Sequence, residues 1–182
     1  MVATFQSVLR ARLDQPYVVA EFGARWGTWA TRAVAFLRRR RPELAYRMHM
    51  AEAYRPACEA IEVVARLNGF VNYTVECGRA SGESLRRWLA DQGHVDLIDF
   101  DIEGGEHAAL REAAELLEEK VYRITVATHQ PAGTQLHEQT KGFLLSRGHQ
   151  QSRHAPFSSA PTACALPGEA AVGGFSSPRR RT

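Results

Sequence analysis

Acidic side chains gather where one apolar run of the chain gives way to glycine. Asp99, Asp101 and Glu103 alternate along this stretch, so an extended strand would place their side chains on the same side. Crowded carboxylates repel one another, which raises a pKa or attracts a cation, and oxygen ligands favour Mg²⁺ or Ca²⁺. A carboxylate here is also suited to accept a proton in catalysis. Glu103 and Glu106 also fall at the N-terminus of a predicted helix, whose dipole they would stabilise.

A second acidic stretch ends in a glycine turn. Glu21 closes an apolar run and precedes Gly23 and Gly27, which would let the backbone approach a ligand closely. Its carboxylate is suited to accept hydrogen bonds from a hydroxyl or ammonium group of a ligand. A dinucleotide fingerprint needs glycine two and five residues after Gly23, where this chain has Arg25 and Thr28. The spacing therefore argues against NAD.

Two further residues follow predicted strands. Glu52 ends the second strand, where a carboxylate can bind both hydroxyls of a ribose; the alternative is a solvated surface side chain. His129 follows the fifth strand, where an imidazole would act as a general base or have a structural role. In an open α/β sheet, ligands bind at the carboxyl ends of the strands. We therefore expect Glu21, Glu52, Asp101 and His129 to surround one small-molecule site.

These side chains must be positioned by alternating strands and helices. Apolar runs and helical spacings alternate along the chain, which predicts βαβ units, a mostly parallel sheet and a doubly wound, three-layer α/β/α fold. The strands are expected over 17–22, 45–51, 71–76, 95–101 and 121–128, and the helices over 27–40, 56–67, 81–92, 106–120 and 134–146.

Length and composition favour one globular domain. The 182 residues are 45% hydrophobic, and residues 1–150 carry the alternating pattern. Residues 151–182 are rich in Ser, Pro, Ala, Gly and Arg, which predicts a low-complexity, disordered tail. No apolar run is long enough for a membrane span, and Arg10, Arg12 and Asp14 interrupt what would be a signal peptide. We expect no membrane partner and a cytoplasmic location.

Charge and cysteine usage point to no special partner. The net charge of +3 comes from arginine runs at 38–41 and 179–181, and the rest of the chain is mildly acidic. Basic and aromatic residues do not interleave, so nucleic acid is not an expected partner. Cys58, Cys77 and Cys164 lack the short spacing of a zinc or redox motif. We expect them to be buried or incidental thiols.

Several motifs occur in an order that resembles a known family. They are Glu21-Phe22-Gly23-Ala24-Arg25-Trp26-Gly27-Thr28, Glu52 with Pro56 after it, Asn68-Gly69, Asp101-Ile102-Glu103-Gly104-Gly105-Glu106, and His129. Together, over roughly residues 17 to 150, they resemble class I S-adenosylmethionine-dependent methyltransferases with a Rossmann-like fold. More narrowly, they resemble the FkbM family of O-methyltransferases.

The resemblance implies an enzyme that transfers a methyl group from S-adenosyl-L-methionine to oxygen, with a small hydroxylated metabolite or sugar as acceptor. The cofactor-binding residues that it implies are Glu21, Gly23, Ala24, Arg25, Gly27 and Glu52, and the catalytic residues are Asp101, Glu103 and His129. A divalent metal such as Mg²⁺ is left open. The chain departs from the family at Asp99, where Lys is usual, and at Ala127, where an acid is usual. The sixth and seventh strands of the fold are not evident, so we expect them to be missing.

Two alternatives stay open. The run Leu97-Ile98-Asp99-Phe100-Asp101 looks like the nucleophile strand of haloacid-dehalogenase-type phosphatases, with Asp99 as nucleophile, Asp101 as acid/base and Mg²⁺ as cofactor. That family expects this strand first in the fold and Gly-Thr soon after it, whereas Glu103-Gly104 follows here. The other alternative is a catalytically inert, S-adenosylmethionine-binding partner subunit. A sheet without its last strands would expose an edge, which also allows a homo-oligomer.

Overall fold

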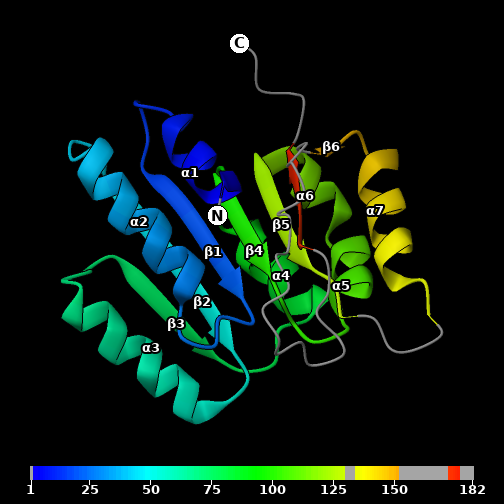
Figure 1. Cartoon of the computed structure of the whole chain (residues 1–182), viewed down its shortest axis with the longest axis horizontal. Coiled ribbons are helices and arrows are strands. Elements are labelled where there is room, and N and C mark those ends of the chain that lie inside the picture. Colours follow the sequence, from blue (N-terminus) through cyan, green and yellow to red (C-terminus); the bar gives the residue numbers. More distant parts are fainter. Residues whose placement is uncertain (1, 130–133, 152–171, 177–182) are drawn as a thin grey trace, which may run out of the picture.

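A twisted seven-stranded sheet forms the centre of the computed structural model, which describes residues 2–129, 134–151 and 172–176 (Figure 1). The strand order is β3-β2-β1-β4-β5-β7-β6. The first five strands are parallel, and β7 runs antiparallel to both of its neighbours. Their bounds are β1 Tyr17–Phe22, β2 Tyr46–Glu52, β3 Tyr73–Cys77, β4 Leu97–Phe100, β5 Arg123–Ala127, β6 Gln150–Gln151 and β7 Val172–Ser176.

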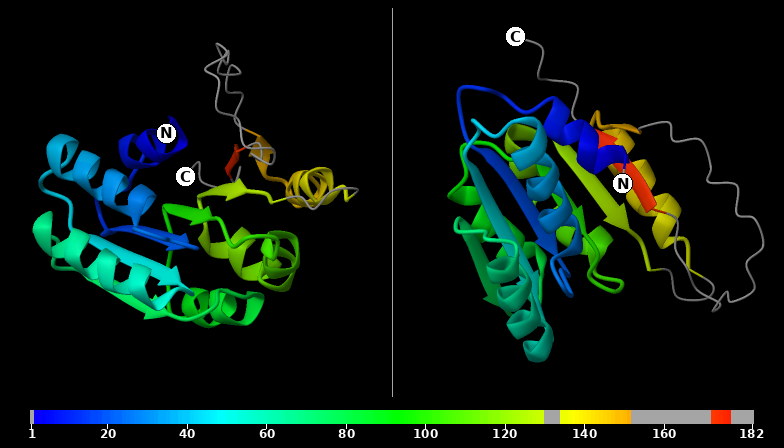
Figure 2. Two further views of the ribbon diagram at one scale, coloured as in Figure 1. Left: turned by 60° about the horizontal axis from the view of Figure 1, so that its bottom comes forward. Right: turned by 60° about the vertical axis from the view of Figure 1, so that its left-hand side comes forward.

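Helices cover both faces of the sheet, which gives three layers (Figure 2). One face carries α1 (Val2–Leu9), α2 (Thr28–Arg40) and α3 (Arg55–Leu67). The other carries α4 (Gly82–Ala90), α5 (Glu106–Glu112), α6 (Ala114–Lys120) and α7 (Leu136–Ser146). Alternate residues of β1 enter the two cores: Val18, Ala20 and Phe22 on one side, and Tyr17 and Val19 on the other. The predicted doubly wound α/β/α fold is confirmed.

The expectation that the late strands are missing is wrong. β7 pairs with β5 over five residues, from Arg123 opposite Ser176 to Ala127 opposite Val172. The sequence of β7, Val-Gly-Gly-Phe-Ser, has no apolar alternation, and its two glycines weaken any strand signal. Its pairing with β5 therefore depends on the sheet and not on local pattern. The predicted disordered tail, 151–182, is wrong for the strand residues; its other residues lie outside the described ranges.

Two helical predictions also need correction. The helix expected over 106–120 is divided at Ala113, whose backbone leaves helical geometry between α5 and α6. The helix α1 was not predicted, because only eight residues form it. The hydroxyl groups of Ser7 and Tyr17 hydrogen-bond at 2.7 Å and fasten α1 to β1. None of the helices in the described part of the chain is long and apolar enough to cross a membrane.

The cysteines do not behave as incidental thiols. Cys58 and Cys77 form a disulfide, and Cys164 lies outside the described residues. Cys77, the last residue of β3, pairs with Glu52 at the end of β2. The helix α3 begins just after Glu52 and carries Cys58 in its first turns, so the two sulfur atoms meet at the carboxyl edge of the sheet. The sheet edge at β5, which missing late strands would have exposed, is paired with β7, and a homo-oligomer stays a prediction.

Candidate cofactor and active site

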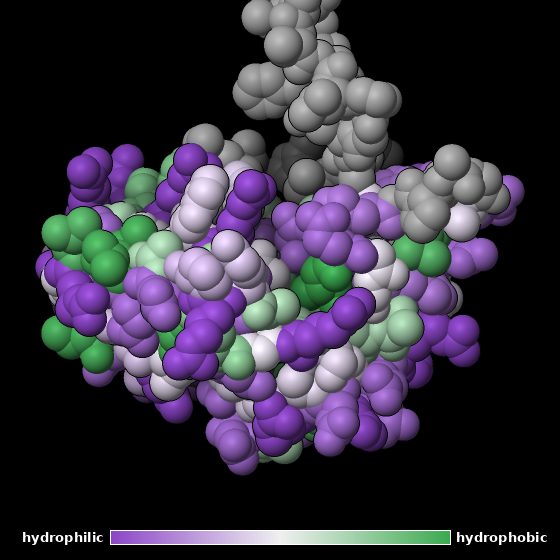
Figure 3. All heavy atoms as spheres, turned by 90° about the horizontal axis from the view of Figure 1, so that it is seen from below, coloured by the Kyte–Doolittle hydropathy of each residue, from purple (hydrophilic) through white to green (hydrophobic). Residues whose placement is uncertain are grey.

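A pocket of about 540 Å³ opens at the carboxyl ends of the parallel strands. Its walls come from the glycine turn after β1, from the end of β2 and the residues that follow it (within 51–57), from residues 79–80 after β3 and from residues 101–103 after β4. Figure 3 shows this side of the molecule, where hydrophilic side chains cover most of the surface. The volume suits a small organic ligand, and the position is where open α/β sheets bind one.

The glycine turn packs tightly between β2 and β4. The backbone N–H groups of Gly23 and Ala24 both donate to the carbonyl of Ala51, at 2.9 and 3.0 Å. Gly23 has a φ of 80°, and a Cβ there would collide with the carbonyl oxygen of Asp101. Gly27 has a φ of 68°, and a Cβ there would lie 2.7 Å from the sulfur of Met50. Both glycines are therefore required by the fold of the turn.

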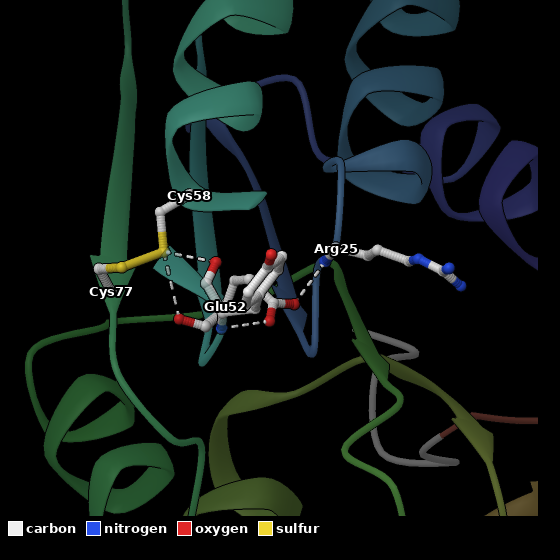
Figure 4. Close-up of a disulfide and its surroundings, with 5 residues drawn as sticks. Arg25, Glu52, Cys58 and Cys77 are labelled. Atoms are coloured by element: carbon white, nitrogen blue, oxygen red, sulfur yellow. Dashed lines mark hydrogen bonds between the residues drawn. A yellow bond between two sulfur atoms is a disulfide. The ribbon is translucent and has the colours of Figure 1, made fainter. Parts of the chain in front are cut away.

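Glu52 links the glycine turn to the segment that follows β2 in the pocket wall (Figure 4). Its Oε2 accepts the backbone N–H of Arg25 at 2.7 Å, and its Oε1 accepts that of Tyr54 at 2.7 Å. These two bonds fix the carboxylate and leave further acceptor sites on both oxygens. The predicted binding residues Gly23, Arg25 and Glu52 all line the pocket. The side chain of Arg25 turns away from Glu52 and lies over the ring of Trp26.

Glu21 has a different place from the one expected. It is 2% exposed, and its Oε2 accepts the backbone N–H groups of Trp29 and Ala30 at the start of α2. Burial and the nearby Asp99 raise the pKa of Glu21 to about 8. Glu21 does not line the pocket, and neither do Ala24 and Gly27. The carboxylate of Glu21 therefore holds the first turn of α2, while the pocket is bordered by Gly23 and Arg25.

Asp101, Glu103 and His129 meet as predicted. Nδ1 of His129 lies 3.4 Å from Oδ1 of Asp101, and Nε2 lies 3.8 Å from Oε2 of Glu103. Asp101 and Glu103 line the pocket, and His129 stands behind them at the end of β5. Burial raises the pKa of Asp101, although the proximity of His129 opposes the shift. One ligand atom from each of the three residues lies within 4.8 Å of the others, a spacing that can hold a metal ion.

The buried carboxylate of Glu106 supports this cluster. Glu106 is fully buried, and it accepts backbone N–H groups from Ile102 at 3.1 Å and from Gly104 at 3.0 Å. Its Oε1 also lies 3.3 Å from Nδ1 of His129. The loop that it holds contains Glu103, whose φ of 59° is unusual for a residue other than glycine. The sequence suggested only that Glu106 stabilises the helix dipole; the structure adds its contacts with the loop and with His129.

Asp99 lies in β4, opposite Glu21 in β1. The hydroxyl of Thr125 donates to its Oδ1. Burial raises the pKa of Asp99 to about 7, and the charge of Asp101 adds to this shift. Asp99 does not line the pocket, and its strand is the fourth along the chain. Both facts argue against the phosphatase alternative, in which Asp99 would attack the substrate.

The pocket residues that were not predicted include two large polar side chains. Tyr54 is 67% exposed at the start of α3, and Arg79 follows β3. Both line the pocket. Their position just after a parallel strand is the only signal that the sequence offers for them.

Comparison with known proteins places the fold. No family model and no curated protein matches the chain. Among solved structures, an rRNA methylase from Streptococcus thermophilus has a TM-score of 0.63 at 12% identity, over 97% of this chain and 94% of that one. Precorrin-6y C5,15-methyltransferase from Geobacter metallireducens has a TM-score of 0.61 at 14% identity, over 96% and 87% of the two chains.

An O-methyltransferase is also similar. The S-adenosylmethionine-dependent O-methyltransferase from Thermotoga maritima has a TM-score of 0.57 at 14% identity, over 100% of this chain and 66% of that one. These proteins differ in what they methylate, and the identities are low, so the likeness concerns the fold. The chain has the Rossmann-like fold of S-adenosylmethionine-dependent methyltransferases.

Proposed function

We propose that this protein is an S-adenosylmethionine-dependent methyltransferase that methylates an oxygen of a small hydroxylated metabolite or sugar, as the resemblance to FkbM proteins implies. One observation carries the proposal: a single pocket has Glu52 on one wall and Asp101 with Glu103 on another, with His129 in contact with both acids. Glu52 is suited to bind a nucleoside. Asp101, Glu103 and His129 are suited to remove a proton from an acceptor.

The residues present fit the nucleoside part of the cofactor. The carboxylate of Glu52 is fixed by two backbone N–H groups and keeps free acceptor sites, which suit the two hydroxyls of a ribose. Tyr54 and Ala80 also line the pocket near Glu52, and they offer an aromatic and an apolar surface to a base. When bound, the cofactor supplies a methyl group on a positively charged sulfur, which is already activated for transfer.

The residues on the opposite wall have two tasks. They hold the acceptor in line with the methyl group, because a reacting pair must be kept at near-attack distance. They also take up the proton that an alcohol loses on methylation. Asp101 and Glu103 line the pocket and can take up the proton, and the imidazole of His129, which contacts Asp101 at one nitrogen and Glu103 at the other, can accept it from them. The two carboxylates stabilise the imidazolium that forms.

A divalent cation offers a second route for the proton. Asp101, Glu103 and His129 can supply ligand atoms to one ion, and a bound Mg²⁺ would lower the pKa of an acceptor hydroxyl. The two routes respond differently to a chelator. Proton transfer to His129 alone survives EDTA, whereas a metal-assisted route loses its rate and regains it with added Mg²⁺.

We favour a small acceptor because Asp101 and Glu103 give this wall a negative charge, which repels the phosphates of a nucleic acid. The proposal is tested by incubating the protein with methyl-labelled S-adenosylmethionine and a panel of sugars and phenolic or aliphatic alcohols, with rRNA as a separate arm. We expect S-adenosylhomocysteine to form with at least one hydroxylated small molecule. Cofactor binding without transfer to any acceptor would instead favour the inert partner subunit.

A further inference from the structure

The disulfide between Cys58 and Cys77 lies beside the backbone of Glu52, the residue whose carboxylate we assign to the cofactor (Figure 4). Sγ of Cys58 is 3.4 Å from the carbonyl oxygen of Glu52 and 3.6 Å from that of Tyr54. A disulfide sulfur carries no proton, so these are contacts and not hydrogen bonds in the oxidised state. The backbone N–H of Gly78, next to Cys77, donates to the same Glu52 carbonyl at 2.9 Å.

The disulfide also joins two stretches of the pocket wall. Cys58 follows Tyr54 and Ala57, which line the pocket, and Cys77 precedes Arg79 and Ala80, which line it as well. β3 is an edge strand, so β2 is the only strand that pairs with it in the described sheet. The disulfide thus links the edge strand β3 covalently to α3, next to the residues that line the pocket.

The two half-cystines differ in exposure. Cys58 is only 5% exposed, whereas Cys77 is exposed to solvent. An external thiol can therefore reach Cys77 and release Cys58 as the leaving group. Accessible disulfides are the ones that exchange, while buried structural ones resist reduction.

We propose that Cys58–Cys77 is a thiol–disulfide exchange site, and that its oxidised form holds the pocket wall in the arrangement that binds the cofactor. The effect on binding rests on the function proposed above; the exchange and the ordering of the wall do not. A second observation supports the site: the sulfur of Cys58 has carbonyl acceptors within reach, so the reduced thiol has hydrogen-bond partners in place.

The reductant is a dithiol. One of its thiolates attacks Sγ of Cys77, the bond between the two protein sulfurs breaks, and Cys58 leaves as a thiolate that takes up a proton. The second thiol of the reductant then attacks the mixed disulfide and releases Cys77 as a thiol. In total the protein disulfide gains two electrons and two protons, and the dithiol becomes a disulfide.

Reduction should loosen the wall without unfolding the domain. The tie between β3 and α3 is lost, while the pairing of β2 with β3 and the Gly78 hydrogen bond remain. Residues 53–57 and 78–80 must then be ordered when the ligand binds. Ordering even one or two side chains costs binding free energy, so we expect reduction to weaken cofactor binding about three- to tenfold.

The test uses the full chain in a Cys164→Ser background, so that the third cysteine takes no part. Oxidised protein and protein reduced with dithiothreitol are compared by hydrogen exchange and by calorimetric titration with S-adenosylhomocysteine. Alkylation and mass spectrometry count the free thiols in each sample. Cys58→Ser, Cys77→Ser and the double variant are the matched controls, because none of them can form the bond.

After reduction we expect two free thiols and faster hydrogen exchange at 53–58 and 77–81, with the rest of the sheet unchanged. The Kd for S-adenosylhomocysteine should rise about three- to tenfold. The serine variants should have the hydrogen-exchange rates and the Kd of the reduced protein, and dithiothreitol should not change either quantity. Two free thiols before reduction, or none after it, would overturn the thiol–disulfide exchange site. Equal hydrogen-exchange rates in both states would overturn the ordering of the wall. Equal Kd values in both states would overturn its effect on binding. If hydrogen exchange changes on reduction but S-adenosylhomocysteine binds in neither state, the proposed function is contradicted. The ordering of the wall by the disulfide would still be supported.

Discussion

Glu52 accepts the backbone N–H of Arg25 at 2.7 Å, although 27 residues separate the two in the chain. The bond joins the end of β2 to the glycine turn after β1. Arg25 has a φ of 51°, so its N–H is presented by a backbone conformation that is uncommon outside glycine. The carboxylate that is suited to bind the ribose is thus oriented by the turn that borders the rest of the pocket, before any ligand arrives.

Replacing Glu52 with Gln should weaken the binding of S-adenosylhomocysteine by about tenfold or more, because a neutral amide loses the charge-assisted bonds to ligand hydroxyls. Calorimetric titration measures the change. Glu59→Gln, on the exposed side of α3, is the matched control and should bind as the wild type does. Equal affinity of the Glu52 variant and the wild type would remove Glu52 from the site.

Asp101→Asn should lower turnover by about 100-fold while changing cofactor affinity by less than about twofold. Its carboxylate contacts His129 on the acceptor wall, where removal of a proton acceptor or its partner carries costs of this order. The rate with a working acceptor and the Kd are measured on the same sample. Asp91→Asn, at the exposed end of α4, serves as the control. A variant that keeps the wild-type rate would exclude Asp101 from catalysis.

Glu106→Gln should reduce the free energy of unfolding by about 1–3 kcal/mol, since an amide NH2 in place of Oε2 cannot accept the N–H of Gly104 and the negative charge beside His129 is lost. Urea denaturation followed by circular dichroism gives the value. The pH profile of turnover should also shift, because Glu106 contacts the imidazole. Glu115→Gln, exposed on α6, should leave both quantities unchanged. A Glu106 variant as stable as the wild type would show that the loop does not depend on this carboxylate.

Asp99→Asn should make the stability of the protein less dependent on pH between pH 5 and pH 8. The pKa of Asp99 is raised from its ordinary value of 3.8 to about 7, so the folded chain binds this proton more tightly than the unfolded chain. The stabilisation is complete below about pH 4 and is lost as the pH rises through about 7. Relative to the wild type, the variant should gain about 1–3 kcal/mol in stability between pH 5 and pH 8.

Urea denaturation at the two pH values measures this difference. The amide oxygen of the new Asn can still accept the hydroxyl of Thr125, so the variant is expected to fold. Parallel pH dependence in wild type and variant would mean that Asp99 is ionised in the folded protein throughout this range.

The sequence was sufficient for the features that depend on local pattern. Apolar runs and helical spacing identified the five parallel strands, and the rule that strand ends meet at one edge brought Glu52, Asp101 and His129 together. Glu21 shows the limit of that rule. It stands near the end of its strand as predicted, but its side chain enters the core and bonds to α2, because alternation in β1 directs Glu21 to the α2 face.

Other features depend on pairing between distant segments. The disulfide follows from the register of β2 and β3, which puts Cys77 opposite Glu52, and the spacing of 19 residues does not reveal it. β7 has no periodicity of its own and forms only because β5 offers it a partner. The FkbM relationship, the acceptor and the cytoplasmic location stay predictions.

Titration calorimetry of the oxidised full chain shows whether the pocket binds S-adenosylmethionine. We predict one site with a Kd in roughly the micromolar range, equivalent to about 8 kcal/mol, and no binding of NAD. If folded protein releases no heat with S-adenosylmethionine, or binds NAD instead, the pocket is not a site for S-adenosylmethionine.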